Sequence, residues 1–535
     1  MTAIAQTILL MMAVLAAVAV AAKRLHVAPS ILLVVAGIGM ALIPGLPRIQ
    51  LAPELVLLVI LPPLIYSAGV SMSWREFRFN LRPIALLAFG AVVFTTCAIA
   101  AAAHYLLHFD WAVGFVLGAI IAPPDVVAPL AIARRLGLPR RIAVILEGEG
   151  LANDATALIL YRFAVVAVSL GTFSPLQASG TFAAIVIGEI IYGIAVGWLS
   201  LRLRKWAHEP RVEITLSLMT PYLAYWVPEH FGGSGVLATV ACGLYVSWVG
   251  PRLIPSGTRL QGIFFWDLII YLIEGLVFLL TGLQARALLE QVQAFSLSEV
   301  LAATALTTAI AIAARFIWVF LAIYLPRWLI PSVDKRDPAP RWQGPFLLGF
   351  TGIRGVVSLA AALAIPYTIA NGQPFPHRDL ILFITFGVIV VTLVGQGMML
   401  PLVVEWLGLA KLGKEEHKHE LKDELEARQA ALHEVRKRLE KAIKDHELPG
   451  SAADHLRTRN QGRLQVLPEN LTEGLVQMRQ TAALKLELIS AERDFIYQLL
   501  QEGKITDEAR RRIEYELDLE EAGVANRGQD GGGWI

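Results

Sequence analysis

Ten ionisable side chains lie inside stretches of sequence that are otherwise apolar. An ionisable group within a membrane-spanning segment costs about 2.5–3.5 kcal/mol on insertion scales, so each one is a candidate functional residue. Seven of the ten are acidic, which favours a pathway for cations. The ten residues are Asp125, Glu147, Glu149, Asp154, Arg162, Glu189, Asp267, Glu274, Arg315 and Arg354.

The densest group of these residues is the segment Glu147–Asp154, which reads Glu-Gly-Glu-Gly-Leu-Ala-Asn-Asp. In a helix Gly150 and Asp154 are four residues apart and share a face, and Glu149 is one position away from it. Asp154 lies near the middle of its apolar run. A carboxylate at that depth can bind a small cation or a proton but not comfortably both, and this competition is enough to couple two opposite fluxes. The structural alternative is a buried carboxylate paired with an arginine.

A pair of prolines interrupts another apolar run. Pro123 and Pro124 directly precede Asp125, and proline both removes a backbone donor and clashes with the preceding turn. We therefore expect a broken helix here, with exposed carbonyl groups and half-helix dipoles of the kind from which many transporters build cation sites. The structural alternative is a simple kink in which Asp125 caps the second half-helix.

Two further charged residues belong to the candidate site. Arg354 lies between two glycines in the segment Thr351–Gly355. We expect an acid, Glu149 or Asp125, to neutralise this arginine, and such a pair would be costly to break. Arg354 would then hold the architecture of the site rather than touch the ion. Glu274 lies near the middle of a different run and is equally compatible with a role in the ion path and a role in helix packing.

Thirteen apolar runs approach the length of about 20 residues that a membrane-spanning helix needs. Helices are expected because every backbone polar group in lipid requires an internal partner. The sequence therefore predicts an all-α membrane protein, in which an odd first span and twelve others suggest two inverted six-helix repeats. The runs cover approximately residues 3–22, 27–45, 54–71, 83–107, 112–133, 142–169, 178–203, 212–229, 234–250, 260–284, 297–325, 344–368 and 379–408.

The positive charges between the runs predict the orientation of the chain. With the N-terminus outside, the inside loops carry 19 Lys and Arg residues, and the outside loops carry only Arg48, Arg286 and Arg378. Loops rich in Lys and Arg stay in the cytoplasm. Residues 1–410 are thus predicted to form the transmembrane domain, and the C-terminal region is predicted to be cytoplasmic.

Residues 411–535 have a different composition from the rest of the chain. They contain 21 Lys and Arg and 25 Asp and Glu, whereas residues 1–410 contain 25 and 19. Charged helical sequence at 415–447 and 469–502 predicts a mainly helical region, with a break at 448–451, a short last helix capped by Thr506 and a disordered end at 528–533. A solvated appendage and a regulatory or dimer-supporting module both fit this pattern.

Several classes of protein do not fit the sequence. The net charge of +2 forms no basic stripe for nucleic acid, and the two cysteines stand alone in apolar runs. No spacing of metal ligands, no Ser–His pair and no nucleotide-binding loop is present, so we expect neither an enzyme nor a cofactor. A cation channel normally needs rings of filter groups from several subunits. A single central carboxylate and broken helices favour alternating access instead.

At these residues the chain resembles the first family of monovalent cation:proton antiporters, which contains bacterial and animal Na⁺/H⁺ exchangers. Six segments fit the signatures of that family in the right order, and together they extend over the whole membrane part. The segments are Leu61–Gly69, Pro123–Val126, Glu147–Asp154, Gly232–Ala238, Gly352–Leu359 and Thr392–Gly397.

The resemblance implies a secondary active antiporter of a bacterial inner (plasma) membrane, which exchanges Na⁺ or K⁺ for protons by alternating access. Asp154 would bind the cation and the proton in competition, with Asn153 beside it, and an asparagine there is typical of electroneutral members. Asp125 and Arg354 would form a crossed, unwound core, with Glu149 paired to Arg354. The resemblance further implies a homodimer in which each protomer has an interface domain and a moving core domain.

Three positions depart from the family pattern. Ser67 stands where archaeal relatives often have Glu, Gly150 where many members have Ser, and Pro124 where Thr is usual. The site therefore lacks at least one side-chain oxygen, and a hard cation would need backbone carbonyls or water instead. A K⁺-selective exchanger thus stays open as an alternative to a Na⁺ exchanger, and a cation channel stays open as a further alternative.

Overall fold

The structure is a computed structural model that describes residues 2–44, 51–170, 175–291, 296–370, 372–445, 450–465 and 471–528. Within these ranges the chain is helical and contains no β-strand, apart from an isolated bridge between Thr368 and Pro374. The prediction of an all-α protein is confirmed. The chain divides into two compact units, Met1–Gly413 and Lys414–Ile535, which are taken separately below.

The first half of the larger unit contains nine α-helices and two π-helical segments among its described residues. In chain order they are α1 (Thr2–Leu25), α2 (Pro29–Ala41), η1 (Leu55–Ile60), α3 (Leu61–Ser71), α4 (Trp74–Phe79), α5 (Leu81–Ala85), η2 (Leu86–Ala91), α6 (Val92–Leu107), α7 (Trp111–Ile121), α8 (Val127–Leu136) and α9 (Arg140–Leu170).

The second half of this unit is also helical throughout its regular elements in the described ranges. Its elements are α10 (Pro175–Ala207), α11 (Pro210–His230), α12 (Val236–Leu253), α13 (Ser256–Leu283), α14 (Ala285–Gln291), α15 (Leu297–Leu329), α16 (Pro331–Arg336), α17 (Gln343–Phe350), α18 (Val356–Leu363), α19 (Arg378–Val390), η4 (Val391–Gln396) and α20 (Gly397–Trp406).

Eight helices in the described ranges are long and apolar enough to cross a membrane, and three further apolar helices have 10–17 residues. Some of the predicted runs are divided between two short helices, and neither of these helices alone is long enough to cross a membrane. Residues 112–133 are divided between α7 and α8, and residues 344–368 between α17 and α18. The total of thirteen spans and the inverted repeats remain predictions.

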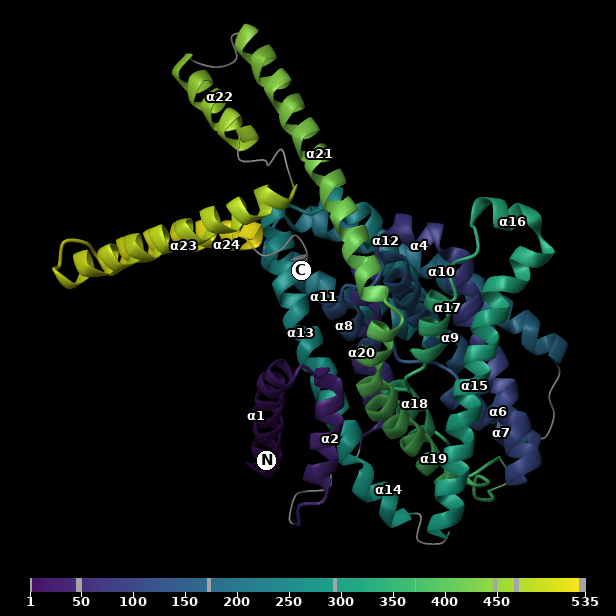
Figure 1. Ribbon diagram of the computed structural model, residues 1–535. Helices are drawn as coiled ribbons and strands as arrows, with labels where there is room; N and C mark the ends of the chain where they lie inside the picture. Colours follow the sequence, from purple (N-terminus) through teal and green to yellow (C-terminus); the bar gives the residue numbers. More distant parts are fainter. Residues whose placement is uncertain are drawn as a thin grey trace. The chain divides into compact units, whose positions relative to one another are not determined.

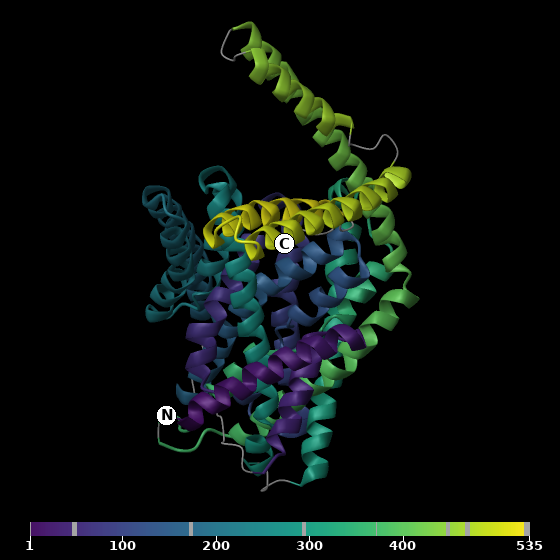
Figure 2. The same ribbon diagram turned by 90° about the vertical axis from the view of Figure 1, so that its left-hand side faces the viewer.

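Small residues let the helices of this unit approach closely. Gly37 of α2 faces Gly282 of α13, and a Cβ atom on Gly37 would lie 2.3 Å from the carbonyl oxygen of Leu279. Such contacts are typical of helix pairs in membranes, where dispersion packing replaces the hydrophobic effect. Figure 1 shows α2 beside α13, and α17 beside α15. In Figure 2 the N-terminal helix α1 runs obliquely across the face turned to the viewer.

The smaller unit consists of two helical pairs. Helix α21 (Leu409–Lys444), which begins in the larger unit, is followed by α22 (Gly450–Gln465), α23 (Leu471–Gln501) and α24 (Asp507–Gly528). Arg457 on α22 binds both carboxylate oxygens of Glu440 on α21, at 2.9 and 2.7 Å. These hydrogen bonds hold the pKa of Glu440 below its usual range.

The predictions for this region are partly right. Thr506 caps α24, since its hydroxyl accepts a hydrogen bond from the backbone N–H of Ala509 at 3.2 Å. Helix α22 was not predicted, and α24 has 22 residues instead of being short. Most of the end predicted to be disordered, residues 529–533, lies outside the described residues.

Candidate cation-binding site

Two interrupted helices meet at the centre of the larger unit. Residues 122–126 separate α7 from α8, and residues 351–355 separate α17 from α18. The interruption predicted from Pro123 and Pro124 is therefore present. The two breaks touch, because the backbone N–H of Asp125 donates to the carbonyl of Ile353 at 2.6 Å. A Cβ atom on Gly355 would lie 1.9 Å from Asp125 Oδ2, so the crossing requires glycine for space.

Charged side chains stand at the ends of the half-helices. Asp125 Oδ1 accepts a hydrogen bond from the N–H of Val127, the first residue of α8, at 2.9 Å. Arg354 Nε donates to the carbonyl of Ile121, the last residue of α7, at 2.9 Å. An anion at a helix N-terminus and a cation at a C-terminus both complement the helix dipole. The capping role considered for Asp125 is thus present.

The predicted pair between Glu149 and Arg354 is wrong. Glu149 instead forms a bidentate ion pair with Arg315 of α15, with N–O distances of 2.5 and 2.9 Å. Both side chains are buried, at 0% and 2% exposure. Arg354 donates to the backbone carbonyls of Ile121 and Gly352. The physical reason is that the unwound backbone supplies this arginine with acceptors, so that it does not need a carboxylate.

Asn153 joins α9 to the broken segment. Its Nδ2 donates to the carbonyl of Pro124 at 2.6 Å. Its Oδ1 is buried and has no hydrogen-bond partner among the residues that the structure describes. The residue is absent from the described lining of the neighbouring cavity, which contains Asp154. Asn153 therefore holds the broken segment at Pro124 through a hydrogen bond and does not itself line the cavity.

A cavity of about 450 Å³ lies beside the crossing. This space is large enough for several water molecules. A cation can therefore reach the crossing with part of its hydration shell. Six of the predicted site residues line the cavity, namely Ser67, Pro124, Asp125, Gly150, Asp154 and Glu274.

The cavity is strongly acidic. Five carboxylate side chains and one guanidinium group, that of Arg134, line it in the described part of the chain. Arg134 is paired with Glu147 at 3.6 Å and is largely exposed at the mouth. Asp267 is also exposed, whereas Asp154 and Glu274 are half-buried further inside. The excess of negative charge attracts cations and repels anions.

Asp154 is, like Asp125, Asp267 and Glu274, a carboxylate of this cavity that has no ion-pair partner among the described residues. Among the described residues its side chain has no hydrogen-bond partner and no ion-pair partner. Its neighbour Glu149, one and a half turns away on α9, is fully neutralised by Arg315. The alternative of a structural Asp154–Arg pair is therefore not met in the described part of the chain. Asp154 is available for a proton or a cation.

The glycine at position 150 has a steric reason. A Cβ atom there would lie 2.2 Å from Cγ2 of Val126. The valine side chain thus occupies the space that a serine at this position would need. Position 150 therefore has no side-chain oxygen because Val126 of the broken segment fills the space that such a side chain would need.

Sequence reasoning gave too little weight to two residues of this region. Arg315 and Asp267 were among the ten intramembrane charges, but no glycine, proline or second charge in a motif singled them out. Arg315 is separated from Glu149 by 166 residues, so only the tertiary structure pairs them. The apolar stretch around Arg315 was the available signal, since such an arginine needs a partner.

Crossed half-helices next to an unpaired carboxylate in a cavity large enough for several water molecules define a class of protein, the secondary transporters with discontinuous helices. Comparison with known proteins gives the family. Residues 10–406 match the family model described as sodium/hydrogen exchanger, transmembrane. The chain therefore belongs to the sodium/hydrogen exchanger family, whose members are antiporters.

Individual relatives agree with this assignment. An uncharacterized Na⁺/H⁺ exchanger of Mycobacterium tuberculosis is 36% identical over 386 residues, which is 72% of this chain and 71% of the relative. A sodium, potassium, lithium and rubidium/H⁺ antiporter of Bacillus pumilus is 34% identical over 69% of this chain and 56% of the relative. The antiporter MjNhaP1 of Methanocaldococcus jannaschii has a similar fold, with a TM-score of 0.60, 18% identity, and 77% of this chain and 99% of that chain covered. The predicted family and fold class are confirmed.

Proposed function

We propose that this antiporter exchanges Na⁺ or K⁺ for protons by alternating access, with Asp154 as the shared binding group for both ions. The observation that carries the proposal is the carboxylate of Asp154, which lines an acidic cavity without a neutralising partner among the described residues. A buried lone carboxylate is unfavourable as a free anion. It therefore takes up either a proton or a cation, and each excludes the other.

We propose that the exchange is electroneutral, with one group at the crossing changing its ligand. Glu149 is neutralised by Arg315, and position 153 is an uncharged asparagine. Asp154 alone then changes its ligand during the cycle. One monovalent cation in one direction and one proton in the other carry no net charge across the membrane.

The cation is substrate, and we propose no resident cofactor. Oxygen ligands besides Asp154 would come from Asp125, the hydroxyls of Ser67 and Ser358, and water in the cavity, because all three side chains line the same space. A site with few protein oxygens and much water selects weakly between Na⁺ and K⁺. The name of the Bacillus relative, which includes both ions, agrees with K⁺ as an alternative substrate.

The larger unit would span a bacterial plasma membrane, with the N-terminus outside and the smaller unit in the cytoplasm. The excess of Lys and Arg in alternate loops supports this orientation. With it, the exposed mouth near Arg134 and Asp267 faces the cytoplasm. Helices α10 and α11 expose an apolar groove of about 390 Å³, and this surface supports the expected homodimer.

Competition between the two ions is tested by initial rates of exchange in everted membrane vesicles with a pH-sensitive dye. In the acidic range, each decrease of one pH unit should raise the apparent KM for Na⁺ by about tenfold, because protons compete for one group, and the maximal rate should stay constant. The same series with K⁺ and Li⁺ ranks the ions. A maximal rate that falls with pH at an unchanged KM would show that protons act elsewhere.

A further inference from the structure

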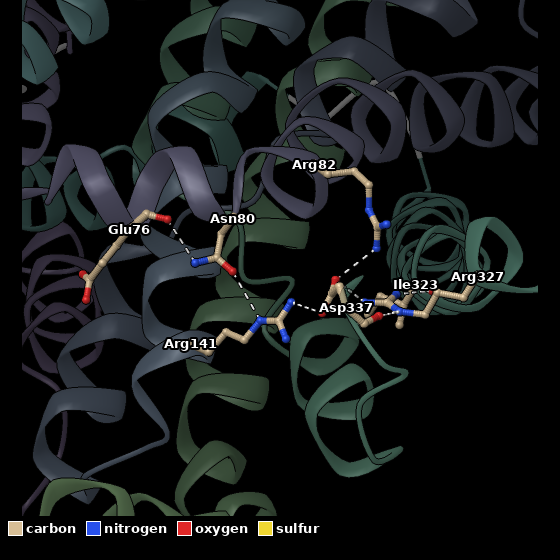
Figure 3. Close-up of polar contacts among 7 residues, drawn as sticks. All are labelled: Glu76, Asn80, Arg82, Arg141, Ile323, Arg327 and Asp337. Atoms are coloured by element: carbon tan, nitrogen blue, oxygen red, sulfur yellow. Dashed lines mark hydrogen bonds and ion pairs between the residues drawn. The ribbon is translucent and has the colours of Figure 1, made fainter. Parts of the chain in front are cut away.

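Three arginines from three different helices converge on one aspartate, and none of these four residues lines the cation cavity. Arg82 of α5, Arg141 of α9 and Arg327 of α15 each donate to the carboxylate of Asp337, at 3.2, 2.7 and 2.6 Å. Figure 3 shows the four side chains pointing toward one another. These residues are called the Asp337 cluster below.

The Asp337 cluster is positively charged. Three guanidinium groups face one carboxylate, which leaves a formal excess of two positive charges. The neighbouring ion pair of Arg140 and Glu76, with an Nε–Oε1 distance of 2.5 Å, is neutral and does not change this balance. Close like charges repel one another, so the cluster favours an additional anion.

The arginines also have more donors than Asp337 can satisfy. A guanidinium group carries five N–H bonds, and an ionised carboxylate accepts about four. The Nε of Arg82 is buried and has no hydrogen-bond partner among the described residues. Buried donors are nearly always satisfied in proteins. The orphaned donor indicates an acceptor that is not part of the described chain.

An apolar cavity of about 70 Å³ adjoins the cluster. The three arginines form its polar edge, and its walls include Pro83, Leu87, Ile142, Ile145, Ile323 and Leu348. A charged rim above an apolar wall matches a molecule with an anionic head and an aliphatic chain. A free inorganic anion would not use the apolar wall.

Exposed tryptophans place the cluster at the level of lipid headgroups. Trp328, next to Arg327, is 81% exposed, and Trp342 and Trp406 are exposed in an aromatic contact with centroids 5.9 Å apart. Tryptophan is enriched where a membrane protein meets the membrane–water interface. Basic pockets between helices at this level bind anionic lipids.

From these observations we propose that the Asp337 cluster binds the phosphate group of an anionic phospholipid, whose chain begins in the adjoining apolar cavity. With the orientation given above, this lipid belongs to the inner leaflet. The arginines bind the phosphate as charge-assisted donors. Lipid binding here is independent of the transport function proposed for Asp154.

The proposal is tested on the purified full-length protein in nanodiscs that contain phosphatidylglycerol and phosphatidylcholine, by native mass spectrometry of the retained lipid. The wild type should retain phosphatidylglycerol in preference to phosphatidylcholine. The double variant Arg82→Gln/Arg141→Gln should retain it at least about tenfold less, because each basic residue near the surface contributes appreciably to anionic-lipid binding. The single variant Arg82→Gln, expected to lose part of the retention, serves if the double variant does not fold.

The matched control is Arg75→Gln/Arg78→Gln, which removes the same charge from exposed positions of α4 and should keep the wild-type preference. Asp337→Asn should retain phosphatidylglycerol at least as well as the wild type, because it frees donors for the phosphate. Equal retention by the Arg82/Arg141 variant overturns the proposal. Loss of the lipid from a folded Asp337→Asn variant also overturns the proposal. The three arginines would then bind the carboxylate of Asp337 and no phosphate group.

Competition with inorganic phosphate distinguishes a phosphate group that belongs to a lipid from a free phosphate ion. Millimolar inorganic phosphate should leave the retained phosphatidylglycerol in place, because the free ion makes no contact with the apolar wall. Displacement of the lipid by inorganic phosphate contradicts a lipid site.

Discussion

At the scale of residues, the arrangement separates two neighbouring carboxylates into different roles. Glu149 and Asp154 lie on the same helix, α9. Arg315 neutralises Glu149 with two hydrogen bonds, and Asp154 lines the cavity of about 450 Å³. Burial is tolerated for a charge that is paired and hydrogen-bonded. The pair therefore provides rigidity, and the unpaired group is the one that we propose as the exchanging group.

The buried ion pair gives a prediction about stability. Arg315→Gln should destabilise the protein by about 3–5 kcal/mol, because it leaves Glu149 charged and buried without a partner. Thermal unfolding of the detergent-solubilised protein measures this loss. Glu149→Gln combined with Arg315→Gln should recover much of it, since no charge then remains uncompensated. A double variant as unstable as the sum of the two single variants would contradict the pairing.

The contact between positions 150 and 126 gives a prediction about packing. Gly150→Ser should destabilise the protein by about 1–3 kcal/mol through overpacking against Val126. Adding Val126→Ala should relieve the contact, because the clashing atom is Cγ2 of the valine. The unfolding temperatures of the single and double variants measure the relief. If Val126→Ala brings no recovery, the serine is excluded for another reason.

At the scale of elements, the crossing of the two broken helices depends on Gly355. Gly355→Ala should reduce exchange by about tenfold or more, because the new methyl group would overlap the carboxylate of Asp125. The two broken segments would then move apart, and a shift of about 1 Å in a functional site can be that costly. Rates in vesicles with matched protein amounts measure the effect. Gly39→Ala is the control, since a Cβ atom there meets nothing within 4 Å. Equal rates for the two variants would show that the crossing is not required.

Helix breaks and helix caps could be predicted from the sequence where the residues that cause them lie at the break or cap itself. Pro123 and Pro124 break a helix through their own rings, and Thr506 caps the helix that follows it. Helix α22 was missed because residues 450–465 begin with glycine, directly after the Leu448-Pro449 break, and are strongly polar. The Glu149–Arg315 pair was missed because nothing in the chain near Arg315 indicates its partner. The three π-helical segments in the described part of the chain were not predicted either. One of them, η4, carries Thr392, whose hydroxyl accepts a hydrogen bond from the backbone N–H of Arg354 at 3.0 Å.

At the scale of the whole molecule, exchange on one carboxylate, that of Asp154, predicts a definite charge balance. Purified protein in liposomes should exchange Na⁺ for protons at the same rate with and without a potential clamped by K⁺ and valinomycin. The reason is that one cation replaces one proton on Asp154. The initial rate of internal pH change measures this. Exchange driven by the potential alone would mean that a second group moves charge, and Asp125 and Glu274 in the same cavity would then be the candidates.

Exchange by Asp154→Asn in the same liposomes tests the central claim most directly. The asparagine keeps the shape of the side chain but can hold neither a proton nor a counter-charge for Na⁺. Asp110→Asn, the same change at an exposed position before α7, is the matched control. If Asp154 carries both ions, Asp154→Asn should fold and insert like the wild type but exchange no ions at any pH, while Asp110→Asn should exchange normally. Na⁺/H⁺ exchange by Asp154→Asn at the wild-type rate would contradict the account.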